Sequence, residues 1–364
     1  MEYRTLPRGG EKISVIGMGT SAVGEGSPEE IAAVTEKALE YGVNLFDLAS
    51  GHKAAVEGVG KVIKKHREDV FLQIHFGAEF VTGEYGWTTD LSKIKAAVSW
   101  VMEQTGSDYI DFGFIHCMDE NSDFEEYKAN GVIDYIQQLK ADGIVHHLAL
   151  SSHTPAVANR IMDEVDIDLL MFSINPAYDY KLGEYAHGET DERTDLYRRC
   201  EAEGIGISVM KPYCGGQLLD KDQSPFKEAL TEPQCLQYAL DKPGVVSVLT
   251  GFKTIEELDR TMKFFDASED ERDYSILGRL TPEESQGRCV YCKHCHPCPG
   301  GLDIALINKY YDLSCLGDPL AKDHYLNLAK TASACISCGH CNFRCPFHVN
   351  QNERMIEIKN YFGA

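Results

Sequence analysis

From about residue 12 to residue 265, short apolar segments alternate with longer segments in which apolar side chains recur at the helical period. Strands buried on both faces show as continuous apolar runs of about four to eight residues, whereas amphipathic helices carry an apolar stripe. The apolar runs are "ISVIGMG", "NLFDLA", "VFLQIHF", "YIDFGFIHC", "VHHLALSS", "LLMFSI", "IGISVMKP" and "VVSVLTG". Eight strand–helix units in succession predict an α/β fold, a closed TIM (β/α)8 barrel.

Two of the predicted helices begin with a capping box. The boxes are Ser27-Pro28-Glu29-Glu30 and Thr254-Ile255-Glu256-Glu257. In such a box the hydroxyl accepts a backbone N–H three residues on, and the glutamate accepts the N–H of the capping residue. We therefore expect helices to start at about residues 28 and 255.

The chain is predicted to divide into a barrel domain, residues 1–265, a linker, residues 266–283, and a small C-terminal domain, residues 284–364. The charged stretch "DASEDERD" marks the linker, and the composition then shifts to Cys, Gly, Pro and His. The last segment is too short and too polar for a large apolar core. We therefore expect bound metal to supply much of its folding free energy.

The formal net charge of −22 limits the classes of partner, because no cluster of lysine or arginine offsets it locally. A negative chain repels nucleic-acid backbones and anionic membranes. No run approaches the roughly 20 apolar residues that a membrane-spanning helix needs. We expect a cytoplasmic protein with no nucleic-acid partner and no membrane association. Its thirteen cysteines are then metal ligands or buried thiols rather than a disulfide framework.

Eight of the cysteines fall in two similar runs, "CVYCKHCHPCP" and "CISCGHCNFRCP". Each run has three cysteines at C-x2-C spacing and a fourth just before a proline, as in two-cluster ferredoxins, where the fourth cysteine binds the other cluster. The runs predict two [4Fe-4S] clusters in a ferredoxin-like domain. One ligand set is Cys289, Cys292, Cys295 and Cys345, and the other is Cys335, Cys338, Cys341 and Cys298. Zinc is the alternative, although it favours two separated C-x-x-C pairs.

The segments "NLFDLASGH", "DYIDFGFIH", "LALSSH" and "GISVMKP", in this order and at these separations, make residues 1–265 resemble an aldo-keto reductase. The whole chain is similar to the branch of that superfamily that carries a C-terminal double-cluster ferredoxin segment. The resemblance implies a TIM barrel with its site at the carboxyl ends of the strands. It also implies reduction of a ketone or aldehyde with a nicotinamide, where an Asp, a Tyr, a Lys and a His surround the carbonyl oxygen.

Two of these four positions have changed in this sequence. The aspartate and histidine are kept as Asp47 and His116, but His52 stands at the tyrosine position and His75 at the lysine position. These four are the candidate catalytic residues. His52 can act as a general acid because its reference pKa of about 6.5 suits proton donation near neutral pH. Two alternatives stay open: the residues are relics of a lost activity, or the imidazoles and the carboxylate hold a divalent metal.

The same resemblance implies a set of cofactor-binding residues. They are Ser151, Asn175, Lys211, Gly251 and Lys253. Ser151 matches the serine that binds the nicotinamide carboxamide, and Lys253 could meet a phosphate. The glutamine that usually grips the carboxamide and the residue that stacks on the nicotinamide fall on Met171 and Met210. NADP(H) binding is therefore expected to be weakened.

We expect an iron–sulfur oxidoreductase that acts on a small carbonyl or conjugated molecule in the barrel mouth, with electrons carried by the two clusters. A ferredoxin or other redox protein is then the expected partner, in an anaerobic setting. One alternative is an NAD(P)H-dependent carbonyl reductase with altered catalytic residues, and the other is a redox-sensing or ligand-binding protein without turnover. Tyr85 and Trp87, after the third strand, favour an aromatic or planar substrate.

Overall fold

A computed structural model of the 364-residue chain describes all residues except 22, 24–25, 50–51, 81–84, 281–285 and 319. Contacts group the chain into two compact units that interleave along the sequence. Unit 1 contains Met1–Ile174, Ile205–Pro212 and Val246–Asp266. Unit 2 contains Asn175–Gly204, Tyr213–Val245 and Ala267–Ala364.

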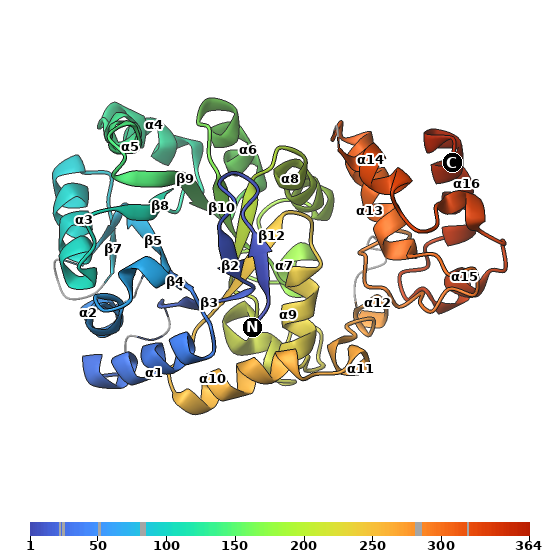
Figure 1. Ribbon diagram of the computed structural model, residues 1–364, viewed down its shortest axis with the longest axis horizontal. Coiled ribbons are helices and arrows are strands. Elements are labelled where there is room, and N and C mark those ends of the chain that lie inside the picture. Colours follow the sequence, from blue (N-terminus) through green and yellow to red (C-terminus); the bar gives the residue numbers. More distant parts are fainter. Residues whose placement is uncertain (22, 24–25, 50–51, 81–84, 281–285, 319) are drawn as a thin grey trace. The chain divides into compact units, whose positions relative to one another are not determined.

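Eight parallel strands close into a barrel (Figure 1). In their order around the barrel they are β10 (Leu169–Ser173), β11 (Gly206–Met210), β12 (Val245–Thr250), β3 (Ile16–Gly19), β4 (Leu45–Asp47), β5 (Phe71–Phe76), β8 (Ile110–Ile115) and β9 (Val145–Ser152). Each strand lies within one of the eight predicted apolar runs, and the predicted α/β barrel is confirmed.

Apolar side chains from the strands fill the barrel together with residues at the N-terminal hairpin, which is formed by β1 (Tyr3–Thr5) and β2 (Lys12–Ser14). The buried cluster consists of Leu6, Ile13, Leu45, Phe112, Phe114, Ala149, Leu169, Met171, Val246 and Leu249. A barrel packed in this way is a core rather than a pore, so its chemistry is expected at the strand ends.

Helices of unit 1 lie around the outside of the strands (Figure 1). They are α1 (Pro28–Glu40), α2 (Lys53–Ile63), α3 (Leu91–Thr105), α4 (Asn121–Ala129), α5 (Val132–Ala141), α6 (Pro155–Glu164) and α10 (Ile255–Met262). The capping box at Ser27 is complete. At Thr254 the hydroxyl caps α10 as predicted, but the Glu257 carboxylate accepts the N–H of Lys253 instead of that of Thr254. The loop after β5 contains a short antiparallel pair, β6 (Ala78–Glu79) and β7 (Gly86–Trp87).

Unit 2 is helical. Its helices are α7 (Pro176–Asp179), α8 (Thr190–Ala202), α9 (Glu232–Leu240), α11 (Glu269–Arg272), α12 (Leu277–Leu280), α13 (Ile304–Cys315), α14 (Ala321–Leu326), α15 (His340–Arg344) and α16 (Gln351–Phe362). Its C-terminal part has an apolar cluster that includes Cys295 and Cys341 beside Ile307, Tyr325 and Ile358. Two of the predicted cluster ligands, Cys295 and Cys341, are therefore part of the apolar core of this region. Among all described residues, no helix has both the length and the apolar composition needed to cross a bilayer.

The two units come close to a predicted domain boundary at one point: unit 1 ends at Asp266, one residue after the predicted end of the barrel domain. Residues 175–204 and 213–245, which the sequence places in the barrel domain, group with the C-terminal residues. Ion pairs join α8 and α13 within unit 2: Arg198 of α8 donates to Asp312 of α13 at 3.0 Å, and Lys309 lies 2.9 Å from Glu201. The predicted linker contains α11 and α12, and its last residues, 281–283, lie outside the described residues. The division into three domains stays a prediction.

Candidate active site at the carboxyl ends of the barrel strands

Three side chains at the carboxyl ends of neighbouring strands and one from the loop after β5 form a continuous line of hydrogen bonds, called here the polar chain. Asp47 ends β4, His75 is the penultimate residue of β5, and His116 follows β8. Asp47 Oδ1 lies 2.7 Å from His75 Nε2, and the Nδ1 atoms of His75 and His116 are 2.8 Å apart. His116 Nε2 lies 2.8 Å from the hydroxyl of Tyr85, which precedes β7. The structure thus brings together three of the four predicted catalytic residues and adds Tyr85.

The polar chain runs from the interior to the surface. Asp47, His75 and His116 are at most 5% exposed, whereas Tyr85 is 41% exposed. His75 lies opposite Phe114 in the register of β5 with β8, and their rings stack with centroids 4.6 Å apart. Packing therefore fixes the buried members, and Tyr85 is the member that a substrate can reach.

The chemistry of the donors and acceptors determines where the hydrogens of the polar chain lie. A carboxylate only accepts, so His75 donates its Nε2–H to Asp47. When His75 is neutral, its Nδ1 accepts the Nδ1–H of His116, and His116 Nε2 then accepts the O–H of Tyr85. Burial, reinforced by His75, holds the pKa of His116 well below its usual value, which agrees with a neutral ring. In the resting state each donor in the polar chain therefore donates toward the interior, from Tyr85 to His116, from His116 to His75 and from His75 to Asp47.

His52, the fourth predicted catalytic residue, is the N-cap of α2 and makes no side-chain cap bond to that helix. The two residues before it, 50 and 51, lie outside the described part of the chain, so its catalytic role stays a prediction. The expectation of a metal held by Asp47 and the three imidazoles fails within the described residues. The nitrogens of His75 and His116 are committed to hydrogen bonds along the polar chain, and the donor atoms that converge belong to other residues.

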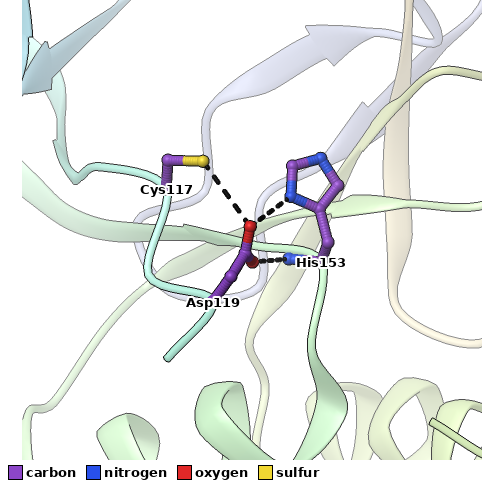
Figure 2. A group of neighbouring side chains, drawn as sticks. All are labelled: Cys117, Asp119 and His153. Atoms are coloured by element: carbon purple, nitrogen blue, oxygen red, sulfur yellow. Dashed lines mark hydrogen bonds and ion pairs between the residues drawn. The ribbon is translucent and has the colours of Figure 1, made fainter. Parts of the chain in front are cut away.

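Cys117, Asp119 and His153 form that converging group, at the ends of β8 and β9 (Figure 2). His153 Nδ1 lies 2.9 Å from Asp119 Oδ2, and Cys117 Sγ lies 3.7 Å from the same oxygen. The second carboxylate oxygen accepts the backbone N–H of His153 at 2.6 Å, which orients the carboxylate. The ligand atoms lie within 4.8 Å of one another. This spacing and these atom types suit a tetrahedral ion such as Zn²⁺ with an open fourth position.

Lys211, which follows β11, opposes metal binding at this group. Its Nζ lies 2.8 Å from His153 Nε2. An ammonium only donates, so Nε2 accepts, and the hydrogen of the neutral ring sits on Nδ1, the atom that faces Asp119. Burial, together with Asp119, raises the pKa of Cys117 to about 12, which keeps the thiol protonated at neutral pH. In this state the group is a hydrogen-bonded array that positions Lys211.

The residues predicted to bind a cofactor differ in their exposure and do not all belong to the same unit. Ser151 is buried near the end of β9, and its Oγ accepts the N–H of Cys117 at 2.8 Å, while no acceptor for its hydroxyl hydrogen is found among the described residues. Gly251 and Lys253 follow β12 and are exposed. Asn175 belongs to unit 2, where its side-chain oxygen caps α7. Their roles in cofactor binding stay predictions.

The cysteines of the two runs line two separate cavities of unit 2, four cysteines in each. One cavity is lined by Cys289, Cys292, Cys295 and Cys345, and the other by Cys298, Cys335, Cys338 and Cys341. The last cysteine of each run therefore lies with the first three of the other run, which is the grouping that the spacing predicts. Burial raises the pKa of Cys289 to about 11 and that of Cys292 to about 12. These thiols become thiolates at neutral pH only beside a cation such as iron.

Tyr85 is the member of the site that the sequence does not assign to catalysis. The alternation of apolar and helical segments places the strand ends, but it does not say which loop residue returns to them. The one signal available is the position of the tyrosine in the loop that directly follows the strand of His75.

Comparisons with known proteins agree with the barrel. The model of the aldo/keto reductase family matches residues 15–234. YqkF of Bacillus subtilis, described as an uncharacterized oxidoreductase, is 24% identical over 316 residues, which cover 78% of this chain and 94% of YqkF. L-glyceraldehyde 3-phosphate reductase of Escherichia coli strain K12 is 23% identical over 234 residues, which cover 61% of this chain and 64% of that protein.

Solved structures show the same fold. The holo form of the aldo-keto reductase AKR11C1 from Bacillus halodurans has a TM-score of 0.62 at 20% identity, and the match covers 78% of this chain and 97% of that one. The aldo/keto reductase of Brucella melitensis has a TM-score of 0.52 at 21% identity and covers 74% and 97%. The family match ends before the first cysteine run and spans more than half of the sequence. This chain belongs to the aldo/keto reductase family, a family of oxidoreductases.

Proposed function

We propose that this chain interconverts a small carbonyl compound and the corresponding alcohol, and that Tyr85 exchanges the proton with the substrate oxygen. The observation that carries the proposal is the polar chain from the exposed Tyr85 to the buried Asp47. Family membership and relatives such as L-glyceraldehyde 3-phosphate reductase support a carbonyl substrate.

The polar chain delivers a proton when it holds one hydrogen more than in the resting state. His75 then carries a hydrogen on both ring nitrogens and donates to Asp47 and to His116. His116 donates its Nε2–H to the oxygen of Tyr85, which leaves the Tyr85 O–H directed at the substrate. As the carbonyl oxygen takes that proton, one hydrogen moves from His116 to Tyr85 and another from His75 to His116. His75 ends neutral, and the reverse sequence accepts a proton from an alcohol.

Two electrons must reach the carbonyl carbon together with this proton. A nicotinamide cofactor supplies them as a hydride when it is bound, and it is the default donor that the family implies. Ser151, with its hydroxyl hydrogen available to a carboxamide oxygen, and Lys253, for a phosphate, are the residues that would hold it. Met171 is buried at the position where the family usually has a glutamine, so one polar contact to the carboxamide is missing. We expect binding weaker than is typical of the family.

The two four-cysteine cavities favour a second electron source. We propose that each cavity holds one [4Fe-4S] cluster, since four cysteines converge on it and a cluster of this type takes four thiolates. Such clusters would supply electrons one at a time, so the carbonyl carbon would take its hydrogen as a second proton from solvent instead of as part of a hydride. A ferredoxin-like protein is the external partner that this source implies.

One anaerobic experiment tests the proposed function and separates the two electron sources. Protein loaded with iron and sulfide is incubated with DL-glyceraldehyde and, in separate arms, with NADPH, NADH or chemically reduced ferredoxin, and the alcohol product is measured. Alcohol formed with a nicotinamide alone supports the first source, and alcohol formed with ferredoxin alone supports the second. The function is overturned if a panel of small aldehydes and ketones gives no alcohol with any of the three donors.

A further inference from the structure

Unit 2 contains a cavity of about 270 Å³ to which the proposed chemistry assigns no role. It is bordered by residues of α8 and by the segment that leads into the first cysteine run. The lining residues that matter here are Tyr180, Asp191, Arg198, Lys242, Arg288 and Asp312. Its size lies near the lower end of small-molecule sites, roughly 300–1,000 Å³. A ligand here would be a small molecule.

Every carboxylate that lines the cavity already has a positive partner. Asp179 lies 2.9 Å from the buried Arg193 and accepts hydrogen bonds from two tyrosine hydroxyls. Asp312 pairs with Arg198 at 3.0 Å and also with Arg354. Asp191 pairs with Arg288. The negative charges of these carboxylates are therefore balanced by arginines of the protein.

Lys242 is the cation of the wall that has no carboxylate partner. It is 8% exposed, and no hydrogen bond or ion pair to its Nζ is found among the described residues. Its Nζ instead lies 3.7 Å from the centre of the Tyr238 ring. The neighbouring Asp241 accepts hydrogen bonds from Gln237 and Tyr274 instead. Asp179 and Asp241 act on this ammonium only from beyond ion-pair distance. A buried ammonium that faces a cavity with no carboxylate in contact is costly unless an anion enters.

Tyr180 adds a second polar group in need of a partner. It is 4% exposed, and its hydroxyl, although close to Tyr238, makes no hydrogen bond of normal geometry with the described residues. An O–H donor and an ammonium on the same wall fit the oxygen atoms of an anion.

We propose that this cavity binds a small organic anion through a carboxylate or phosphate group, with Lys242 as its counter-ion and Tyr180 as a hydrogen-bond donor. The site stands on the geometry of unit 2 alone, so it does not depend on the carbonyl chemistry of the barrel. It adjoins the first cysteine cavity, because Arg288, Cys289, Val290 and Tyr291 line both. When that cavity carries a negatively charged cluster, the anion and the cluster oppose each other through this shared wall. The anion should therefore bind more tightly to the oxidised protein than to the reduced protein.

Titration calorimetry on the full chain loaded with iron tests the site, with inorganic phosphate and malonate as separate probes. We expect one saturable site for at least one of them, and the tighter probe identifies the group recognised. Lys242→Met should weaken binding by at least about tenfold, in line with the loss of a buried charge-assisted bond. Tyr180→Phe should weaken it by several fold.

The matched control is Lys221→Met, at an exposed lysine that lies 3.5 Å from Glu228 and outside the cavity lining. This variant should bind both anions like the unchanged protein. The iron content and circular dichroism of each variant show whether it is folded. If the unchanged protein binds neither anion saturably, the cluster alone is the counter-ion of Lys242 and the proposal is overturned. Equal affinity in Lys242→Met overturns it as well. Neither result depends on turnover, so a failure of the carbonyl chemistry remains distinguishable.

Discussion

His75 and His116 meet through like atoms, Nδ1 to Nδ1 at 2.8 Å, so one ring must donate in this bond and the other must accept. A lysine at position 75, as the family resemblance implies for an ordinary member, could only donate. An imidazole accepts a hydrogen at one nitrogen and donates at the other. The replacement by His75 therefore allows a proton to pass from His75 through His116 to Tyr85 while the other ring nitrogen keeps its hydrogen bond to Asp47.

Replacement of Tyr85 tests the outer end of the polar chain. We expect Tyr85→Phe to lower kcat for carbonyl reduction by about 10²- to 10⁴-fold, the usual contribution of a general acid, with a smaller effect on KM. The free energy of unfolding should hardly change, because Tyr85 is 41% exposed. Tyr361→Phe, at a tyrosine of α16 that is 52% exposed, is the control and should leave kcat unchanged. A kcat for Tyr85→Phe within twofold of the unchanged protein would move the proton donor to another residue, with His52 the first to test.

The buried His116 should make stability depend on pH. Burial lowers its pKa in the folded protein, so below the unfolded pKa of about 6.5 the unfolded chain binds a proton that the folded chain does not. The unfolded state then binds more protons, and the free energy of unfolding falls as the pH falls, by at most about 1.4 kcal/mol per pH unit from this group. Urea unfolding followed by circular dichroism between about pH 5 and pH 8 measures the slope.

His116→Gln removes the titrating group, and its slope below about pH 6.5 should be shallower than that of the unchanged protein. The exposed His66, which lies 3.4 Å from Asp69, provides the matched control: His66→Gln should keep the steep slope. Equal slopes in His116→Gln and the unchanged protein would mean that His116 is protonated in the folded state.

The barrel could be predicted because buried strands and amphipathic helices leave different periods in the sequence. The run that contains His75 shows this: its apolar neighbours Ile74 and Phe76 identify β5, and the carboxyl ends of parallel strands share one rim of the barrel. Asp47, His75 and His116 could be placed together for this reason. The division of the cysteines between two cavities could also be predicted, because the fourth cysteine of each run binds the other cluster in two-cluster ferredoxins.

Loop residues and unpaired buried charges could not be predicted in the same way. Tyr85 lies in a loop whose course depends on tertiary contacts, such as the hydrogen bond from the Trp87 indole to the backbone oxygen of His116 at 3.2 Å. Lys242 stands in the polar sequence "DKPG", which reads as an exposed turn. It is nevertheless buried in a cavity wall that also contains Tyr180 and Tyr291, which are remote in the sequence.

Removal of Lys211 should convert the Cys117 group into a metal site. In Lys211→Met, His153 loses the ammonium that holds its hydrogen on Nδ1, so Nδ1 can face an ion while Nε2–H turns to other acceptors. We expect Co²⁺ to bind this variant at least about tenfold more tightly than it binds the unchanged protein. The thiolate–cobalt absorption band reports binding at a cysteine. Lys211→Met combined with Cys117→Ser should lose the band, and equal Co²⁺ affinity with and without Lys211 would contradict its role.

Pairs of cysteine substitutions test the predicted ligand sets. Cys345→Ser removes one ligand from the cavity that also contains Cys292, so we expect the iron content to fall from about eight to about four atoms per chain. Cys292→Ser should lose the same cluster. Because both residues line one cavity, the double variant Cys292→Ser with Cys345→Ser should still keep about four iron atoms.

A second combination shows the loss of both clusters, which either arrangement of the ligands predicts for it. Cys338 lines the other cavity, although it belongs to the same run as Cys345. Cys292→Ser with Cys338→Ser should therefore lose nearly all iron, as measured by iron and acid-labile sulfide analysis. Cys235→Ser, at a buried cysteine of α9 outside both cavities, is the control and should keep the full iron content. If each run held its own cluster, Cys338→Ser with Cys345→Ser would spare about four iron atoms. The cavities predict instead that this pair loses both clusters, because Cys338 lines one cavity and Cys345 lines the other.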